Sequence, residues 1–124
     1  MKKIETAKAP SAIGPYSQAI EANNTIYVSG QIPVDPSTGE FAGNDIKTNT
    51  KQCLNNIKNI LEEAGYEMSN VVKTTVLLKD IKDFAEMNEV YATFFKDPYP
   101  ARAAFEVVNL PKGAMVEIEA IAAK

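Results

Sequence analysis

The sequence of 124 residues contains no histidine and a single cysteine, Cys53. Without histidine it can build neither a Ser-His-Asp triad nor a Cys-His nucleophile pair, and the usual nitrogen and sulfur ligands of a zinc site are missing as well. One cysteine cannot form an internal disulfide, which fits a reducing compartment. Chemistry in this chain must therefore use carboxylates, main-chain groups, tyrosine, serine, lysine or arginine, and we expect no bound metal.

Sequence signals for nucleotides, nucleic acids and membranes are also absent. The chain has no phosphate loop of the GxxxxGK[ST] type and no GxGxxG after a strand. No apolar stretch is long enough to span a bilayer, and residues 1–5 are not followed by the apolar region of a signal peptide. The net charge of −3 and the pI near 5.0 give no basic footprint for nucleic acid. We therefore expect a soluble cytoplasmic protein without a nucleic-acid or membrane partner.

Hydrophobic periodicity predicts one α+β domain over residues 1–124. Apolar and β-branched segments predict strands over 18–22, 25–30, 71–78, 102–108 and 115–122, and the turn Asn23-Asn24 joins the first two. Apolar residues at helical spacing predict one helix from Asp45 as N-cap to Gly65 as C-cap, and a second over 83–95. Two helices cover only one side of a sheet of about six strands. The other side carries Met115 and Ile121, so we expect it to pack against other copies of the chain.

The last two predicted strands are expected to form a hairpin with a type I turn over 110–113. The register that follows pairs residue 106 with 117, 104 with 119 and 102 with 121. Alternation along the strands then places five side chains on one polar face: Arg102, Ala104, Glu106, Glu117 and Glu119. This face combines one fixed cation with nearby carboxylates.

Arg102 is the only arginine, since the other twelve basic residues are lysines. It follows Pro100-Ala101 among small apolar residues, where a planar and permanently charged guanidinium could grip a carboxylate with two parallel hydrogen bonds. An arginine that supports a neighbouring carboxylate for structural reasons explains the pattern equally well.

Two further residues have structural and functional interpretations. Asn88 lies on the apolar side of the second predicted helix, where its amide needs partners. It could tie the helix to the sheet, which we favour slightly, or contact a ligand. Cys53 falls on the apolar face of the first helix and is interpreted as a small core side chain rather than a reactive thiol.

Several strings together carry a family resemblance, in the right order and through nearly the whole chain. They are Ile13-Gly14-Pro15-Tyr16-Ser17-Gln18, Ser29-Gly30-Gln31-Ile32-Pro33, Val72-Lys73-Thr74-Thr75-Val76, Asn88, Pro100-Ala101-Arg102 and Glu117-Ile118-Glu119-Ala120-Ile121-Ala122. With these strings the chain resembles the Rid family, also called the YjgF family, of reactive imine deaminases, and within it the RidA branch.

The resemblance implies a chorismate-mutase-like α+β fold and a homotrimer with its clefts between subunits. It also implies hydrolysis of 2-iminopropanoate and 2-iminobutanoate, released by pyridoxal-phosphate dehydratases, to 2-oxo acids and ammonia without a cofactor. The serious alternative is a trimeric module that binds small carboxylates and acts through a partner protein without significant turnover. Similar proteins have also been described as translation inhibitors acting on RNA, which the acidic pI disfavours.

Carried over by position, the resemblance assigns roles to residues of this sequence. Arg102 matches the arginine that binds the substrate carboxylate, and Glu119 matches the glutamate that positions and activates water. The resemblance also gives a pocket lining, namely Tyr16, Ser29, Asn88 and Ala104. Many RidA proteins have cysteine at the position of Ala104. We favour a main-chain role there, because hydrolysis needs no thiol when a glutamate directs water.

Overall fold

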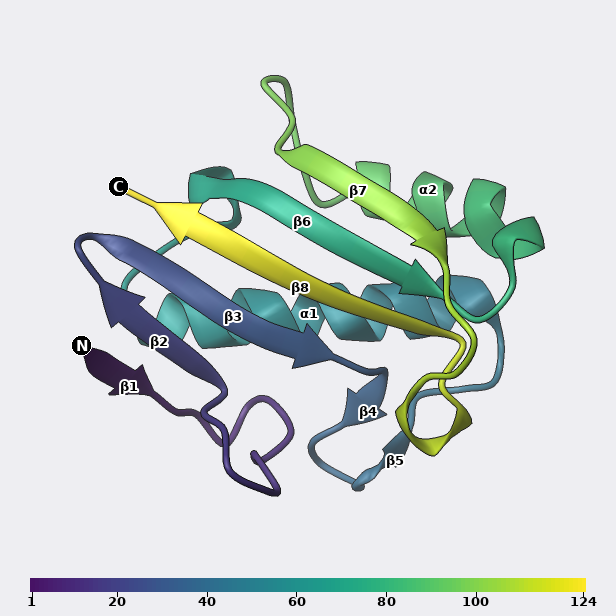
Figure 1. The fold of residues 1–124 in the computed structure, drawn as a ribbon, viewed down its shortest axis with the longest axis horizontal. Coiled ribbons are helices and arrows are strands. Elements are labelled where there is room, and N and C mark those ends of the chain that lie inside the picture. The colour runs from purple at the N-terminus through teal and green to yellow at the C-terminus, as the bar shows by residue number, and fades with distance from the viewer.

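The computed structural model describes residues 1–124 as a six-stranded sheet with two α-helices (Figure 1). The elements are β1 (Lys2–Ile4), β2 (Ala19–Ala22), β3 (Thr25–Gln31), β4 (Val34–Asp35), β5 (Glu40–Phe41), α1 (Ile46–Glu63), β6 (Val71–Leu78), α2 (Phe84–Ala92), β7 (Ala101–Glu106) and β8 (Val116–Ala123). Short 3₁₀ turns occupy Met68–Asn70, Ile81–Asp83 and Pro111–Gly113. No helix combines the length and the apolar character needed to cross a membrane.

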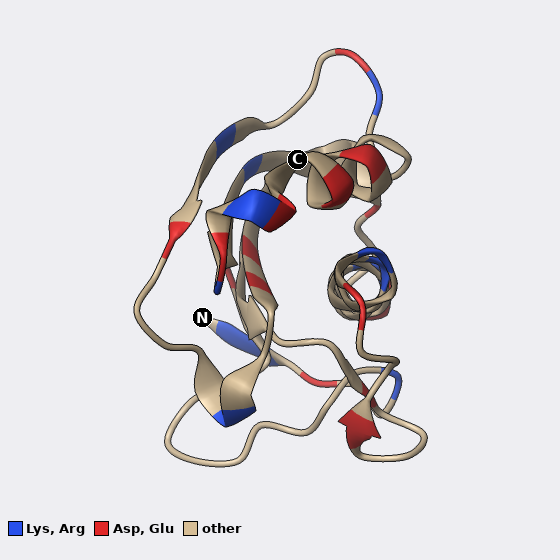
Figure 2. Cartoon of the chain, turned by 90° about the vertical axis from the view of Figure 1, so that its right-hand side faces the viewer, with Lys and Arg blue, Asp and Glu red and all other residues tan.

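The sheet has the order β1-β2-β3-β8-β6-β7, and β4 pairs with β5 in a separate two-stranded sheet. Only β6 and β7 are parallel neighbours. The connections from β3 through α1 to β6, and from β6 through α2 to β7, advance across the sheet in the same direction. Because such crossovers are right-handed, both helices are placed on the same face. Figure 2 shows both helices on one side of the sheet, which confirms the predicted α+β arrangement.

Local signals set the first hairpin and the first helix where they were predicted. Asn23 and Asn24 have φ values of 52° and 56°, as a two-residue I′ loop requires. The Asp45 carboxylate accepts a hydrogen bond of 3.0 Å from the Thr48 N–H and caps α1. At the other end the C-cap is Ala64, one residue before the predicted Gly65. Gly65 follows with a φ of 80°. This is the left-handed conformation that glycine usually supplies at a Schellman-type helix end.

The core lies between the helices and one face of the sheet. Twenty-two buried residues form one cluster, to which α1 contributes Leu54, Ile57, Ile60 and Leu61 and the central strands contribute Ile26, Val28, Val76, Leu78, Val116 and Ile118. Cys53 is fully buried in this cluster, which confirms it as a core side chain. Burial also raises the pKa of its thiol, so the reactive thiolate is disfavoured.

The prediction of a C-terminal hairpin is wrong. β7 and β8 do not pair, because β6 lies between them, parallel to β7 and antiparallel to β8. Both strands hydrogen bond to the end of β6: the Val107 N–H donates to the Leu78 carbonyl and the Lys79 N–H to the Met115 carbonyl. Lys112 has a φ of 56°, so residues 110–113 do not form a type I turn either. The crossover through α2 places β7 on the outer edge of β6. The pairing partner of β7 is therefore β6, although β8 is the strand that follows β7 in the sequence.

The second helix is shorter than predicted and ends at Ala92. The Thr93 and Phe94 amides donate to the carbonyls three residues earlier, and the Thr93 hydroxyl also bonds the Val90 carbonyl at 2.6 Å. The last turn therefore tightens into 3₁₀ geometry, and the helix stops before Phe95.

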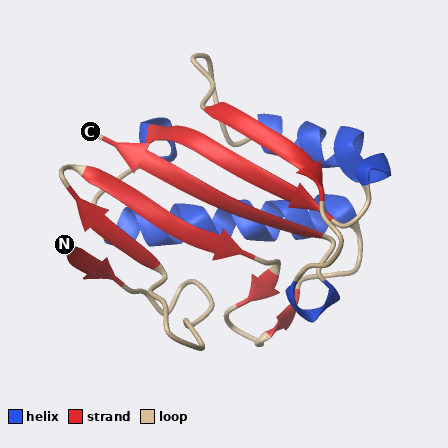
Figure 3. Cartoon of the chain, in the orientation of Figure 1, coloured by secondary structure: helices blue, strands red, loops and turns tan.

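Figure 3 shows the helices behind the strands, so no helix covers the opposite face of the sheet. That face is partly apolar. Tyr27 and Phe105 are 51% and 48% exposed on it. Alternation along the strands adds the half-buried Ile20, Leu77 and Ile121 to this face. Met115, which was expected here, precedes β8 and packs against the core cluster instead. Exposed apolar side chains on an uncovered sheet face favour an interaction surface.

Candidate functional site

The Arg102 side chain extends from β7 across α2. Its Nη1 atom donates a 2.6 Å hydrogen bond to Asn88 Oδ1, and its Cζ atom lies 4.7 Å from the centre of the Tyr91 ring and 5.4 Å from that of Phe84. These three partners follow at i, i+4 and i+7 along α2, so they form one stripe that faces β7. The prediction that Asn88 shares a side with Phe84 and Tyr91 is thus confirmed.

Arg102 has no carboxylate partner in the chain. The two ion pairs join Lys3 with Glu5 and Lys47 with Glu89. Arg102 therefore does not support a neighbouring carboxylate of its own chain, so the structural interpretation is wrong. A guanidinium has five N–H donors, and only one bonds here, so the exposed Arg102 retains donors for an anion.

Ala104 lies on the same edge of the sheet as Arg102. β7 is the last strand of the sheet, and the Val107 N–H donates to the Leu78 carbonyl of β6. In a parallel ladder alternate residues direct their main-chain groups to the same side. The amides and carbonyls of Arg102 and Ala104 are therefore directed away from β6, toward the free edge. We call the Arg102 side chain, Asn88 and the main chain of Ala104 the arginine edge.

Glu119 lies elsewhere, on the open face of β8. The pairing of β3 with β8 shifts between Val28 and Gln31, so that Ser29 and Gly30 form a bulge opposite Glu119. The Ser29 hydroxyl donates a 2.6 Å bond to the Ser17 carbonyl, which ties the loop carrying the exposed Tyr16 to this bulge. We call Glu119, Ser29 and Tyr16 the glutamate side.

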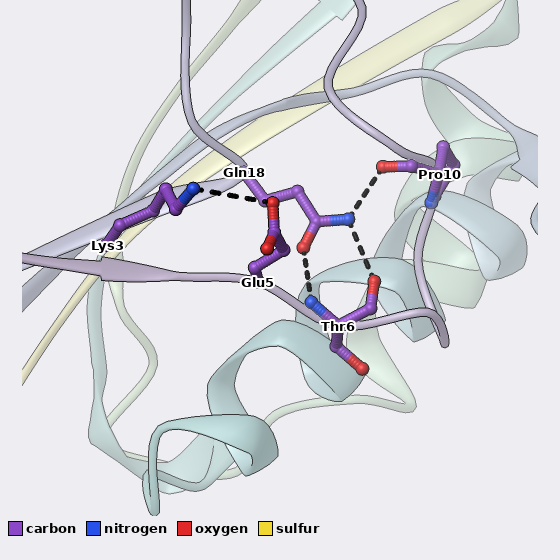
Figure 4. A network of polar contacts seen from close by, with 5 residues as sticks. All are labelled: Lys3, Glu5, Thr6, Pro10 and Gln18. Carbon is purple, nitrogen blue, oxygen red and sulfur yellow. Dashed lines mark hydrogen bonds and ion pairs between the residues drawn. The ribbon is translucent and has the colours of Figure 1, made fainter.

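Gln18 holds the loop that precedes the glutamate side, and the sequence did not single it out. Its buried amide accepts from the Thr6 N–H at 2.7 Å and donates to the carbonyls of Thr6 at 3.0 Å and Pro10 at 2.8 Å (Figure 4). A buried polar side chain with satisfied partners fixes the backbone around it. Gln18 thus joins residues 6–10 to the strand that follows Tyr16. A glutamine at the start of a predicted strand gave too weak a signal to find this role.

Gly30 leaves room for a neighbouring carboxylate. A Cβ atom at this position would collide with the carboxylate of Glu117, which lies on the open face two residues from Glu119. Desolvation, and then the charge of Glu119, raise the pKa of Glu117 above its ordinary value. Arg102 is not a neighbour of this carboxylate pair.

The Glu117 carboxyl is expected to make stability depend on pH. Because its folded pKa is raised, the folded state favours the protonated form, and stability falls as pH rises from the unfolded pKa through the folded pKa. Glu117→Gln removes this penalty, so its melting temperature should exceed that of the wild type at about pH 7, and the difference should vanish below about pH 4. Solvent screening keeps the effect small, because the side chain is only half-buried. Calorimetry at both pH values measures it, and a difference that does not change with pH would contradict the assignment.

The expectation that Arg102 shares a face with Glu117 and Glu119 is wrong. Arg102 pairs with Thr74 of β6, on the helix face, whereas Glu119 pairs with Thr75, on the open face. Adjacent residues of a strand point to opposite faces, so a shift of one residue in the expected register is enough to separate them. Arg102 is also two strands away from β8, about 10 Å in the sheet. One chain therefore holds the arginine edge and the glutamate side apart.

One cavity of the chain belongs to neither group. Its volume is about 460 Å³, and it lies beyond the C-terminal end of α2, where Met68, Val71, Phe94, Phe95 and Pro100 are among its lining residues. No group of three or more cysteine, aspartate or glutamate side chains could hold a metal ion. The candidate chemistry therefore rests on the arginine edge and the glutamate side.

Fold and site together define a small α+β protein with an arginine on a sheet edge and a glutamate on an uncovered sheet face. The family model described as Endoribonuclease L-PSP matches residues 6–124. The chain belongs to this family, the Rid or YjgF family, as its motifs indicated.

Individual relatives are similar over almost their whole length. A RutC family protein of Pyrococcus horikoshii is 59% identical over 98% of this chain and 96% of its own. The 2-iminobutanoate/2-iminopropanoate deaminase of Homo sapiens is 56% identical over 96% of this chain and 87% of its own. The crystal structure of E. coli TdcF with bound serine superposes with a TM-score of 0.95, at 44% identity, over 100% of this chain and 99% of that one.

Proposed function

We propose that this protein hydrolyses reactive 2-imino acids, 2-iminopropanoate and 2-iminobutanoate, to 2-oxo acids and ammonia without a cofactor. The observation that carries the proposal is the arginine edge, where the Arg102 guanidinium is held by α2 but has no carboxylate partner. The human relative, at 56% identity, is named as a deaminase of these substrates. A cytoplasmic location, where such imines would be met, stays a prediction.

In the proposed reaction Arg102 binds the substrate carboxylate with two parallel hydrogen bonds. The outward main-chain groups of Ala104 lie beside it on the same edge, so alanine can serve where many RidA proteins have cysteine. Asn88 supports the guanidinium, as its hydrogen bond to Nη1 indicates.

Glu119 is proposed to direct and deprotonate the attacking water. Water adds to the imine carbon while the π pair of the C=N bond moves to nitrogen, and the proton that Glu119 accepts passes on to nitrogen. The hydroxyl proton of the adduct then passes to nitrogen, an oxygen lone pair forms the C=O bond, and the C–N bond breaks with its electron pair leaving on ammonia, so that the 2-oxo acid forms. Tyr16 and Ser29 are proposed to line the pocket in which the substrate lies.

The two groups can meet only if different subunits contribute them, since one chain holds them on opposite faces of its sheet. We therefore propose a homotrimer in which the arginine edge of one subunit lies against the glutamate side of its neighbour. Burial of the exposed Tyr27 and Phe105 favours such an assembly.

Light scattering at micromolar concentration is expected to give a particle of about three times the chain mass of 13.5 kDa. A monomer would contradict both the trimer and the shared site.

Subunit mixing tests the shared site further. Arg102→Ala and Glu119→Gln should each be nearly inactive. Co-refolding them in equal amounts should recover about one quarter of wild-type activity, the share of interfaces that pair an intact Arg102 with an intact Glu119. No recovery in mixed trimers would place the whole site within one chain.

A binding module without significant turnover is the second candidate. TdcF binds serine, an amino acid that carries a carboxylate, in its crystal structure. An RNA-directed activity, which the description of the family model names, lacks an electrostatic basis. Figure 2 shows acidic and basic residues distributed along the chain, and the net charge is −3.

Turnover separates these candidates. A threonine dehydratase generates 2-iminobutanoate from threonine, and added protein should accelerate the release of 2-oxobutanoate. The Arg102→Ala protein is the matched control. Unchanged release together with measurable binding of 2-oxobutanoate would favour the binding module.

A further inference from the structure

The Arg102 side chain projects from an exposed edge strand, yet α2 fixes its position. A free arginine side chain loses rotamer entropy when it is ordered. Here one hydrogen bond to Asn88 and the faces of two aromatic rings hold the guanidinium. The nearer ring is that of Tyr91, 4.7 Å from Cζ.

Tyr91 is itself anchored in the core. It is 4% exposed, and its hydroxyl shares a buried hydrogen bond of 2.7 Å with Thr74 Oγ1. Thr74 is the residue of β6 that pairs with Arg102, so the ring bridges α2 to the strand beside the arginine. Phe95 packs against the same ring at 4.8 Å between centroids. The ring therefore has little freedom to move beneath the guanidinium.

The Tyr91 ring is neutral and therefore suits contact with the Arg102 cation. Burial raises the pKa of the Tyr91 hydroxyl, against the smaller opposing effects of Thr74 and Arg102, so the ring stays neutral. A guanidinium over a neutral ring face is stabilised by the ring quadrupole, while its N–H donors remain in its own plane.

We propose that Tyr91, locked by Thr74, is a positioning residue that sets the plane of the Arg102 guanidinium for in-plane capture of a substrate carboxylate. The ring covers one face of the cation, and Asn88 occupies one N–H of Nη1. The remaining donors then point along the edge where the main chain of Ala104 is exposed. This role rests on the proposed function only for the identity of the anion.

Binding measurements test the role, with 2-oxobutanoate as the probe. Tyr91→Leu removes the ring and should weaken binding by about 2- to 30-fold, the range for a cation–π contact, and should raise KM with little change in kcat. Tyr91→Phe keeps the ring and should retain most of the affinity. In an Arg102→Ala background the Tyr91→Leu substitution should have no further effect, because it acts through the arginine.

The chain offers a matched control at its other buried tyrosine with a cation over the ring. Tyr66 is 3% exposed, and Lys124 Nζ lies 4.5 Å from its ring centre. Tyr66→Leu should lose stability, as Tyr91→Leu does, but should leave binding unchanged. Equal losses of affinity in both variants would assign the effect of Tyr91→Leu to general destabilisation and overturn the proposal.

A second readout does not depend on any substrate. Because Arg102 is the only arginine, its Nε–H gives a single side-chain resonance in the NMR spectrum. In the wild type this resonance should be displaced by the Tyr91 ring current and should report an ordered side chain. Tyr91→Leu should move it toward the position of free arginine, with only the displacement due to the Phe84 ring remaining. An unshifted, mobile signal in the wild type would overturn the proposal even if 2-oxobutanoate binds. A shifted signal without 2-oxobutanoate binding would instead contradict only the proposed function.

Discussion

Arg102→Lys is expected to lower kcat/KM for imine hydrolysis by roughly ten- to a hundredfold, although the charge is conserved. Lysine presents a compact ammonium without the planar fork, so it cannot make two parallel hydrogen bonds to a carboxylate. Its single ammonium nitrogen also cannot donate to Asn88 and occupy the place of the guanidinium carbon over the Tyr91 ring at the same time. Steady-state kinetics with 2-iminobutanoate measure the loss, and titration with 2-oxobutanoate shows how much of it is binding.

The fold should survive this substitution. Arg102 is exposed and makes no ion pair, so the melting temperature should change little. Lys73→Arg, a change of basic side chain on an exposed residue of β6, controls for nonspecific effects of exchanging the two cations. Wild-type activity in Arg102→Lys would show that the arginine has a structural role only.

The parts of the fold that depend on local interactions could be predicted from the sequence. Asn23 and Asn24 favour positive φ values without help from the rest of the chain, and the Asp45 side chain caps its own helix. The apolar stripe around Cys53 could be interpreted correctly because helical spacing alone determines which residues share a face.

Pairings between distant segments could not be predicted in the same way. The sequence favoured a hairpin of the last two strands, because neighbours in the chain are most often neighbours in a sheet. The competing interaction was a parallel pair after a helical crossover, which places β7 beyond β6. No residue between 102 and 115 signals this choice. The resulting shift of one residue moved Arg102 to the face opposite Glu119.

The candidate site shows the same limit. Arg102 stood out as the only arginine, and motif similarity indicated Glu119, but whether they lie together is a property of the sheet and of its assembly. The supporting residues were missed because each looks ordinary in the sequence. Tyr91 reads as a core aromatic residue until its ring is seen beneath the guanidinium, and Gly30 reads as the last residue of a predicted strand until the carboxylate above it is located.

Glu119→Gln is expected to reduce turnover by about a hundred- to ten-thousandfold, the usual contribution of a general base. Glutamine preserves the size of the side chain and can still hold a water molecule. It cannot accept the proton of that water as attack proceeds. Since Glu119 is exposed on the open face, the substitution should leave the fold intact. Imine hydrolysis measured under single-turnover conditions reports the chemical step directly.

Binding of a stable 2-oxo acid should survive in Glu119→Gln, because the carboxylate contact is assigned to Arg102. Removing a negative charge near an anionic ligand should tighten the complex slightly. Glu117→Gln is the matched control, since it makes the same chemical change two residues away on the same face of β8. It should keep turnover within a few-fold of the wild type, with the pH-dependent gain in stability described above. Equal turnover in wild type and Glu119→Gln would remove this carboxylate from the mechanism. A loss in Glu117→Gln that matched the loss in Glu119→Gln would instead assign proton transfer to the pair, whose charges already influence one another.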